Sequence, residues 1–194
     1  MSDERVRLFV ALELPDHVRE ALVRWRVAAL RGEEGLRLLS AEALHVTLCF
    51  LGWRGAQEVE PIAAACASIG AESRLELALA DAVWLPPRRP RVLAVEIEDP
   101  GAALARVQAK VSDVLQAGAW FTPEARPFLG HVTVARVRAG GRVQVRELPS
   151  PPPLRFRGST VSLFRSVLRP DGARYEQLRA VRLGSGWPAF DPGI

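Results

Sequence analysis

Apolar and polar positions along the chain follow two periods, one typical of strands and one typical of helices. Apolar runs and alternating segments bounded by Gly or Pro predict strands, and segments with apolar residues on one helical face predict helices. The predicted strands cover residues 6–14, 36–39, 44–51, 74–85, 91–98, 130–137, 154–168 and 174–183, and the predicted helices cover 16–31, 56–69 and 100–117. Residues 184–194 have neither pattern and are expected to form a loose tail.

The order of these elements repeats along the chain. "VALELP" at residues 10–15 and "VEIEDP" at residues 95–100 share Val, Glu and Pro at a constant offset of 85 residues. Each segment belongs to a strand, is followed by an amphipathic helix, and leads to a strand with the same polar word. We therefore predict an internal duplication and an α+β fold, in which residues 1–194 form a single bilobal domain. Each of its two pseudo-symmetric lobes would have an antiparallel sheet backed by helices, with a cleft between the lobes.

The repeated polar word is His-x-Thr, found in "LHVTLCFLG" (residues 44–52) and "LGHVTVARV" (residues 129–137). The chain has only three histidines, and two of them, His45 and His131, stand in this word. Because alternate strand residues point to opposite faces, each word displays an imidazole and a hydroxyl together, roughly 6–7 Å apart. The same alternation predicts that Cys49 shares the face of His45 and Thr47, and that Val46, Leu48 and Phe50 point into the core.

Composition and charge restrict the kind of protein. The chain carries a net charge of +4, but residues 120–194 hold 12 arginines against five acidic residues. A basic segment of this kind suits an anionic partner such as RNA or a phosphate ester, although a chain whose basic residues are nearly all Arg can be basic for other reasons. No apolar run approaches a membrane span and no signal peptide is visible, so we expect a cytoplasmic protein without a membrane partner. Cys49 and Cys66 are expected to be packed free thiols.

The paired motifs could belong to three kinds of site. A zinc site needs three or four ligands on one ion, and His45 and Cys49 lie roughly 13 Å apart along a strand, so neither a metal nor another cofactor is expected. A serine hydrolase would need a G-x-S-x-G elbow, which the sequence lacks. Two histidines facing each other across a cleft can instead divide the roles of general base and general acid. With Thr47 and Thr133 donating to phosphate oxygens, this arrangement suits metal-free cleavage of a phosphodiester.

The two words, together with "LFVALELP" before the first, resemble the 2H phosphoesterase superfamily, and within it the RNA 2′,3′-cyclic phosphodiesterases formerly called 2′-5′ RNA ligases. The resemblance extends from Arg7 to the "SVLRPDGARYEQL" segment. It implies a bilobal α+β enzyme that opens terminal 2′,3′-cyclic phosphates of RNA, leaves a 2′-phosphate, and joins 2′-5′ linkages weakly and reversibly. It also implies that His45 and His131 are catalytic and that Thr47, Thr133 and Arg136 bind the phosphate.

Strand alternation raises a question about Arg136. In a regular strand Arg136 would point away from the face of His131 and Thr133, so a bulge must re-aim it or its side chain must reach round the strand end. Several aromatic residues are candidates for stacking on a base, namely Phe9, Trp53, Trp84, Phe128 and Tyr175, of which we select Phe9 and Tyr175.

Three functions therefore remain open at this point. The first is hydrolysis of 2′,3′-cyclic phosphates at RNA ends, tRNA fragments among them, by a monomer. The second is a related activity on 2′-5′ oligonucleotides or small cyclic nucleotides. The third is a non-catalytic module that binds RNA ends. The sequence does not decide which histidine is the base and which the acid.

Overall fold

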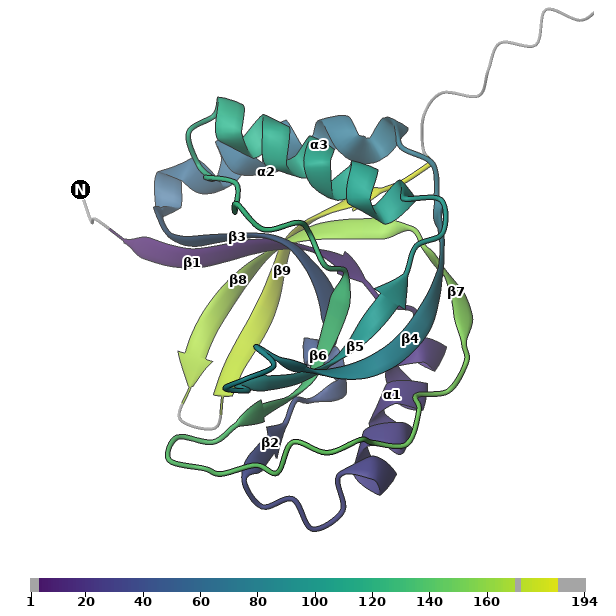
Figure 1. Cartoon of the computed structure of the whole chain (residues 1–194). Coiled ribbons are helices and arrows are strands. Elements are labelled where there is room, and N and C mark those ends of the chain that lie inside the picture. The colour runs from purple at the N-terminus through teal and green to yellow at the C-terminus, as the bar shows by residue number, and fades with distance from the viewer. Residues whose placement is uncertain (1–3, 170–171, 185–194) are drawn as a thin grey trace, which may run out of the picture.

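The computed structural model describes residues 4–169 and 172–184, and all its strand pairs are antiparallel. Within these residues the strands form one curled sheet in the order β7-β4-β5-β6-β3-β1-β8-β9, with β2 paired to β6 (Figure 1). The strands are β1 (Arg5–Glu13), β2 (Leu36–Leu38), β3 (His45–Gly55), β4 (Leu75–Leu85), β5 (Val92–Glu98), β6 (His131–Val137), β7 (Arg155–Gly158), β8 (Thr160–Arg169) and β9 (Gly172–Arg182). The α+β class predicted from the sequence is confirmed.

The sheet consists of two halves that meet at β3 and β6. One half contains β1, β3, β8 and β9, and the other contains β2, β4, β5, β6 and β7. The halves are joined by the pair Val46–Val132, the middle residues of the two His-x-Thr words. The sequence predicted a separate sheet in each lobe. In the structure the two motif strands are next to each other, so they pair and connect the halves into a single sheet.

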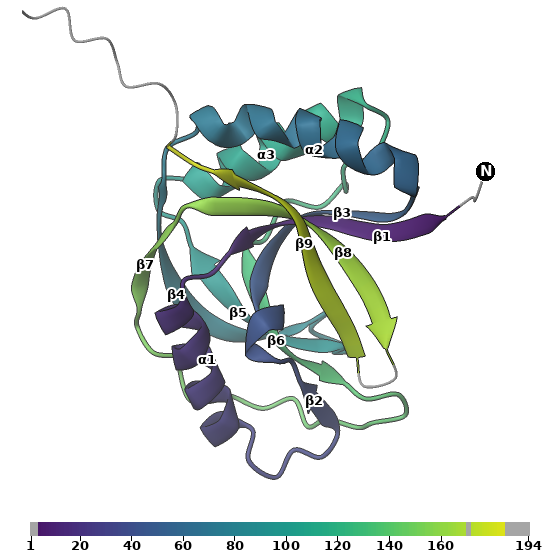
Figure 2. The same ribbon diagram turned by 180° about the vertical axis from the view of Figure 1, so that it is seen from behind.

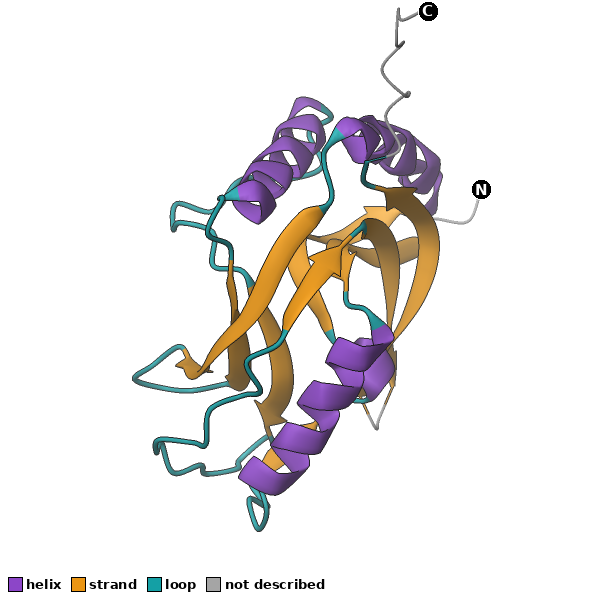
Figure 3. Ribbon diagram, turned by 90° about the vertical axis from the view of Figure 1, so that its right-hand side faces the viewer, coloured by secondary structure: helices purple, strands orange, loops and turns teal. Residues whose placement is uncertain are grey.

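Helices α1 (Asp16–Ala29) and α3 (Ala103–Ala117) each pack against a strand of the half to which their preceding strand does not belong. Helix α1 follows β1 but packs against β6, and α3 follows β5 but packs against β3. Helix α2 (Val59–Ala67) lies beside α3 at one end of the molecule, and α1 lies apart from them (Figures 1 and 2). Figure 3 shows this separation from the side. None of the helices in the described ranges is long and apolar enough to cross a membrane.

The strand register aligns the two halves more accurately than the matching residue types do. Glu13 pairs with His45 across β1 and β3, and Glu96 pairs with His131 across β5 and β6. Glu13 and Glu96 are 83 residues apart in the sequence. The offset of 85 that aligned "VALELP" with "VEIEDP" is therefore two residues too long. Identical residue types in two segments do not show which residues pair across neighbouring strands.

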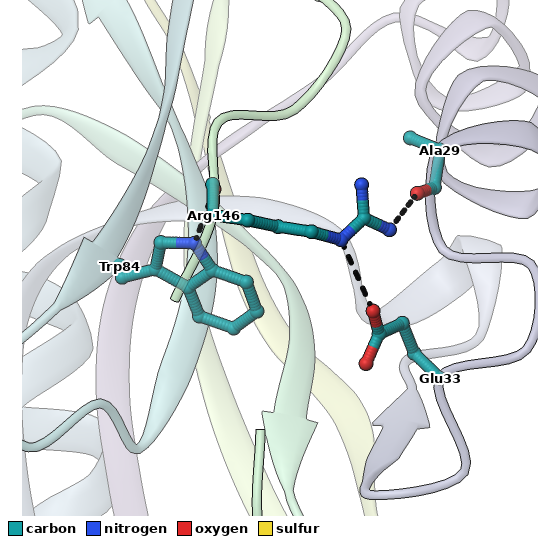
Figure 4. A network of polar contacts seen from close by, with 4 residues as sticks. All are labelled: Ala29, Glu33, Trp84 and Arg146. Atoms are coloured by element: carbon teal, nitrogen blue, oxygen red, sulfur yellow. Dashed lines mark hydrogen bonds and ion pairs between the residues drawn. The ribbon is translucent and has the colours of Figure 1, made fainter. Parts of the chain in front are cut away.

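A long segment without regular structure, residues 138–154, is tied by polar contacts to α1, to the turn after α1 and to β4. The Arg146 side chain bonds the Ala29 carbonyl and the Glu33 carboxylate, both at 3.2 Å, and its carbonyl accepts the Trp84 indole N–H at 3.2 Å (Figure 4). Trp25 donates in the same way to the Pro149 carbonyl at 2.9 Å. The Trp84 N–H thus holds this segment, which gives the ring a structural role in place of the base-stacking role considered from the sequence.

Candidate active site

The two His-x-Thr words lie side by side on neighbouring strands. Because β3 and β6 run antiparallel and Val46 pairs with Val132, Thr47 lies toward His131 and His45 lies toward Thr133. Val46 and Val132 are fully buried, while the four polar residues of the words are partly exposed. The alternation that the sequence predicted for His, x and Thr is confirmed, and both words present their polar residues on the face opposite the core.

A bulge follows each word and changes the alternation. In β6, Ala94 pairs with Thr133 and Leu93 pairs with Ala135, so Val134 is an extra residue. Val134 and Ala135 are consecutively buried, and Arg136 is exposed on the face of His131 and Thr133. The bulge therefore explains how Arg136 reaches the same strand face as His131 and Thr133, although regular alternation would point it to the other face.

The equivalent bulge in β3 corrects two predictions. Val10 pairs with Cys49 and Ala11 pairs with Thr47, which leaves Leu48 as the extra residue. Cys49 is therefore buried on the core side, where burial raises the pKa of its thiol to about 12, and it does not share the face of His45. Phe50, predicted to be in the core, is 48% exposed and has the Arg7 guanidinium carbon 4.7 Å from its ring centroid. Phe50 is the first-half equivalent of Arg136.

Each bulge is held by a side chain from the helix that packs on it. Arg26 of α1 donates from Nη1 to the Val134 carbonyl at 3.1 Å, and the Leu39 N–H donates to the same oxygen. On the other half, Gln108 of α3 donates from Nε2 to the Leu48 carbonyl at 3.5 Å. Arg26 is 5% exposed, and burial lowers the pKa of its guanidinium. A charged group this deep fixes the backbone that aims Arg136.

The sequence reasoning missed both helix residues. Arg26 occupies the apolar stripe of its helix, in line with Val18, Leu22 and Ala29, and a charge in that stripe was the available signal. Gln108 is a polar residue on an ordinary amphipathic helix and gave no comparable signal.

His45 is enclosed by aromatic rings. Its ring stacks on Phe9 with centroids 4.8 Å apart, and it meets the edge of Tyr175 at 5.2 Å. Its Nε2 lies 3.1 Å from the Thr47 hydroxyl. The pKa of His45 is lowered to about 4, mainly by burial; the positive charge of Arg136 and His131 acts in the same direction, and a hydrogen bond with the backbone of Ala43 opposes the shift. His45 is therefore a neutral imidazole at pH 7 in the free protein.

His131 has a similar anchor but a more open setting. Its Nδ1 lies 2.8 Å from the carbonyl of Leu129, two residues earlier, as Ala43 is two residues before His45. A carbonyl at this distance accepts the Nδ1–H and leaves Nε2 to face the site. The aromatic contacts that enclose His45 involve β1, β8 and β9, all in the first half. The two histidines are equivalent by position and differ in environment.

A cavity of about 500 Å³ adjoins this centre. Tyr175 and Arg136 line it, and Tyr175 also contacts the His45 ring. Phe9 is only 3% exposed, with His45 and Phe164 stacked against it, so it offers no open face to a base. Of the two aromatic residues selected from the sequence, Tyr175 borders open space, whereas Phe9 forms the wall behind His45.

Other groups expected from the sequence lie where their chemistry is limited. Cys49 and Cys66 are buried free thiols, as predicted, and burial raises the pKa of Cys66 to about 11. Among residues 4–169 and 172–184 there is no group of three His, Cys, Asp or Glu side chains placed to hold a metal ion. The tail predicted at residues 184–194 lies outside the described residues apart from Gly184.

Comparison with known proteins agrees with this fold. Residues 14–169 match the 2′-5′ RNA ligase superfamily. The RNA 2′,3′-cyclic phosphodiesterase of Escherichia coli K12 is 32% identical over 141 residues, which cover 69% of this chain and 73% of that protein. The enzyme of the same name from Archaeoglobus fulgidus is 29% identical over 190 residues, covering 90% of this chain and 98% of that protein.

Solved structures show the same likeness. The crystal structure of E. coli LigT with 3′-AMP has a TM-score of 0.80 and 26% identity, covering 93% of this chain and 99% of LigT. A Thermus thermophilus protein has a TM-score of 0.80 and 28% identity, covering 91% of this chain and 97% of that protein. The protein belongs to the 2′-5′ RNA ligase superfamily, and the 2H phosphoesterase assignment made from the two motifs is confirmed.

Proposed function

We propose that the protein hydrolyses 2′,3′-cyclic phosphates at RNA ends to 2′-phosphates, without a metal ion, by general acid–base catalysis between His45 and His131. The observation that carries this proposal is the pairing of Val46 with Val132, which puts one imidazole and one threonine hydroxyl of each word at the same junction. Curated relatives named RNA 2′,3′-cyclic phosphodiesterase support the substrate class.

The proposed reaction needs one proton accepted and one donated. Water attacks the phosphorus while one imidazole takes its proton, and the bond from phosphorus to the 3′ oxygen breaks. The other histidine, as imidazolium, gives a proton to that 3′ oxygen, and the phosphate remains on the 2′ oxygen. A 5′-hydroxyl of a second RNA in place of water would run the same chemistry toward a 2′-5′ linkage, which accounts for weak, reversible ligation.

Thr47, Thr133 and Arg136 supply the stabilisation of charge in this proposal. Their hydroxyl and guanidinium groups donate to the non-bridging oxygens, on which negative charge grows as water attacks. Arg136 would contribute most because its charge is fixed and it lies close enough to act on His45. In the first half Phe50 stands in the place that corresponds to Arg136.

The experiment that tests the proposal uses an RNA oligonucleotide with a 2′,3′-cyclic phosphate end, incubated in EDTA. We expect turnover and a product with a terminal 2′-phosphate, identified by its resistance to a 3′-specific phosphatase treatment and by mass. His17→Ala is the matched control, since His17 is the third histidine and is exposed on α1. Loss of turnover in EDTA would refute the metal-free mechanism.

A parallel assay with a 2′-5′ dinucleotide separates the alternatives. A 2′-5′ oligonucleotide phosphodiesterase would cleave a 2′-5′ dinucleotide and leave the cyclic end intact. A non-catalytic module would bind the RNA end and form no product. We further propose that the enzyme acts as a monomer in the cytoplasm, with tRNA fragments among its substrates.

A further inference from the structure

The strand that carries the first His-x-Thr word continues past the site with two exposed aromatic side chains. Phe50 and Trp53 of β3 are each 48% exposed, and every other aromatic side chain in residues 4–169 and 172–184 is buried or half-buried. Exposed apolar residues scattered singly over a surface need no explanation, whereas exposed apolar groups gathered in one place mark interaction sites. The position of this pair, on the strand of His45 and Thr47, therefore indicates a binding surface next to the candidate active site.

A second bulge in β3 places Trp53 on the same face as Phe50. The two residues are three positions apart, so regular alternation would send them to opposite faces of the sheet. The register with β1 shifts between Phe50 and Gly52, which leaves Leu51 as an extra residue. Gly52 has a φ of +73°, a conformation that favours glycine at such a bulge. The backbone of β3 is thus shaped so that both aromatic rings stand on the face of the site.

Arg7 of β1 joins the two rings into one surface. It is the cross-strand partner of Trp53, and its guanidinium carbon lies 4.7 Å from the Phe50 ring centroid. Its Nη1 donates to the Ser166 hydroxyl at 3.5 Å, and none of the ion pairs among the described residues involves it. Exposed rings interleaved with an arginine are the groups that bind the bases and the backbone of single-stranded nucleic acid. We refer to Arg7, Phe50 and Trp53 together as the aromatic surface.

The aromatic surface begins beside the reaction centre and leads away from it. The β1 partner of Thr47 is Ala11 and that of Trp53 is Arg7, four residues further along β1. At about 3.4 Å per residue, Trp53 lies roughly 14 Å along the sheet from Thr47. Because β3 and β6 are antiparallel, this direction is opposite to that of Arg136. The span reaches beyond the nucleoside that carries the reacting phosphate to the nucleotide that precedes it.

We propose that the aromatic surface binds the nucleotide before the last one of an RNA chain, with its base stacked on Trp53 and its phosphodiester in contact with Arg7. The inference rests on the proposed function, and it makes Trp53 a residue that selects RNA chains over mononucleotide 2′,3′-cyclic phosphates. Stacking accepts any base, because every base has a π face, so the selection is for chain length and not for sequence. Among the aromatic candidates considered from the sequence, Trp53 is the exposed one.

The first test varies the substrate while the reactive end stays constant. It compares 2′,3′-cyclic AMP, a trinucleotide ending in adenosine 2′,3′-cyclic phosphate, and the same trinucleotide with an abasic nucleotide before the last. We expect kcat/KM of the complete trinucleotide to exceed both others by at least about tenfold, the size of one base stacked on an aromatic ring. Equal values for all three would overturn the subsite and leave the proposed function intact. Failure to hydrolyse any of them would instead overturn the proposed function.

The second test removes the ring. Trp53→Ala should raise KM for the complete trinucleotide about tenfold, and change kcat/KM for the other two substrates less than about twofold, because neither has a base to stack there. Trp53→Phe should recover most of the loss, since it keeps an aromatic face. Val27→Ala, at a side chain 54% exposed on α1, is the matched control and should leave all three substrates unchanged. Equal losses on all three substrates in Trp53→Ala would overturn the proposal, and mononucleotide turnover reports that the variant is folded.

The third test isolates the contact between Arg7 and the phosphodiester. The slope of log kcat/KM against log salt should be steeper for the trinucleotide than for 2′,3′-cyclic AMP, and Arg7→Gln should reduce the trinucleotide slope by about 0.7, the value for one phosphate contact on a single strand. Arg155→Gln removes an exposed charge from β7, at the edge of the other half, and should leave the slope unchanged. An unchanged slope in Arg7→Gln would remove Arg7 from the subsite.

A second copy of the chain is the competing occupant of the aromatic surface, and light scattering of the unaltered protein and Trp53→Ala measures it. We expect the same molecular mass for both proteins. A dimer that dissociates in Trp53→Ala, with trinucleotide kinetics unchanged, would assign the surface to self-association and overturn the proposal.

Discussion

Val46 and Val132 pair across β3 and β6, and each is the middle residue of its own His-x-Thr word. Features on either side of this pair match between the halves: the bulges at Leu48 and Val134, and the helix side chains that bond their carbonyls. The pair therefore marks a pseudo-two-fold axis. The halves differ where Phe50 corresponds to Arg136 and where aromatic rings enclose His45, so equivalent residues have different properties.

Removal of either imidazole should nearly abolish turnover. His45→Ala and His131→Ala are each expected to lower kcat by about 10² to 10⁴, the contribution of general acid–base catalysis. His17→Ala should retain the activity of the unaltered protein. Rates on an RNA 2′,3′-cyclic phosphate check this, and full activity in either of the first two variants would contradict the paired roles.

The pH dependence of kcat/KM should identify the role of His45. This ratio reports ionisations of the free enzyme, in which the pKa of His45 is about 4. If His45 is the base, it must be neutral, and kcat/KM falls as pH drops through about 4. If His45 is the acid, it must be protonated, and kcat/KM falls as pH rises through about 4. His45→Ala should remove this change in kcat/KM near pH 4. A pH profile with the same shape in the variant would show that His45 does not titrate in the reaction.

The buried, neutral state of His45 should also make stability depend on pH. The unfolded chain takes up a proton near pH 6.5, whereas folded His45 takes it up near pH 4, so acid favours unfolding. This contribution is fully present above about pH 6.5 and is lost as pH falls through 4, a loss of about 3 kcal/mol in the free energy of unfolding.

Urea unfolding at pH 7 and pH 4.5 measures this effect. The stability of the unaltered protein should fall by more than that of His45→Asn between the two values, since the variant lacks the titrating group. His17→Asn controls for the loss of an exposed histidine. Equal pH dependence in unaltered protein and His45→Asn would contradict the lowered pKa.

Arg136 should influence the reaction and the titration of His45 together. Its positive charge is one cause of the low pKa of His45, so Arg136→Gln should raise that pKa, which NMR of the imidazole protons can follow. The same variant should lower kcat/KM about a hundredfold, because a transition-state contact to the phosphate is lost. Arg136→Lys should restore the pKa of His45 but only part of the rate, since Lys lacks the planar fork. A rate unaffected by Arg136→Gln would remove Arg136 from the site.

Arg26 should affect activity and stability in opposite directions. Arg26→Met removes a buried charge whose Nε has no hydrogen-bond partner among the described residues, so the free energy of unfolding should stay constant or rise. The variant also frees the Val134 carbonyl from one donor and lets Arg136 move, so kcat/KM should fall about tenfold.

Gln108→Leu is the matched comparison for Arg26→Met. It acts on the equivalent bulge, which aims Phe50 rather than an arginine, and its effect on kcat/KM should be smaller. Chemical unfolding measures the free energy of unfolding of both variants, and steady-state kinetics measures their kcat/KM. Unchanged kcat/KM in Arg26→Met would show that the bulge holds Arg136 without help from the helix.

Local patterns in the sequence were sufficient for the elements and for the chemistry. Strand and helix periodicities located the regular elements to within a few residues, except that the single strand expected at 154–168 is divided into β7 and β8. Two copies of one polar word, with alternating apolar residues, indicated the candidate catalytic residues and the family. These features depend on neighbours in the chain, which a sequence states directly.

The tertiary structure decided what depends on residues distant in the chain. Whether Arg136 joins the site depends on one extra residue in β6 relative to β5, and the same register error misplaced Cys49 and Phe50. The difference between His45 and His131 comes from rings on β1, β8 and β9 that only folding brings to one imidazole. The sequence by itself determined that two His-x-Thr words exist and that their polar side chains leave the core. Strand pairing, which no local pattern specifies, decided that the words meet at Val46 and Val132 and that one histidine is enclosed there while the other stays open.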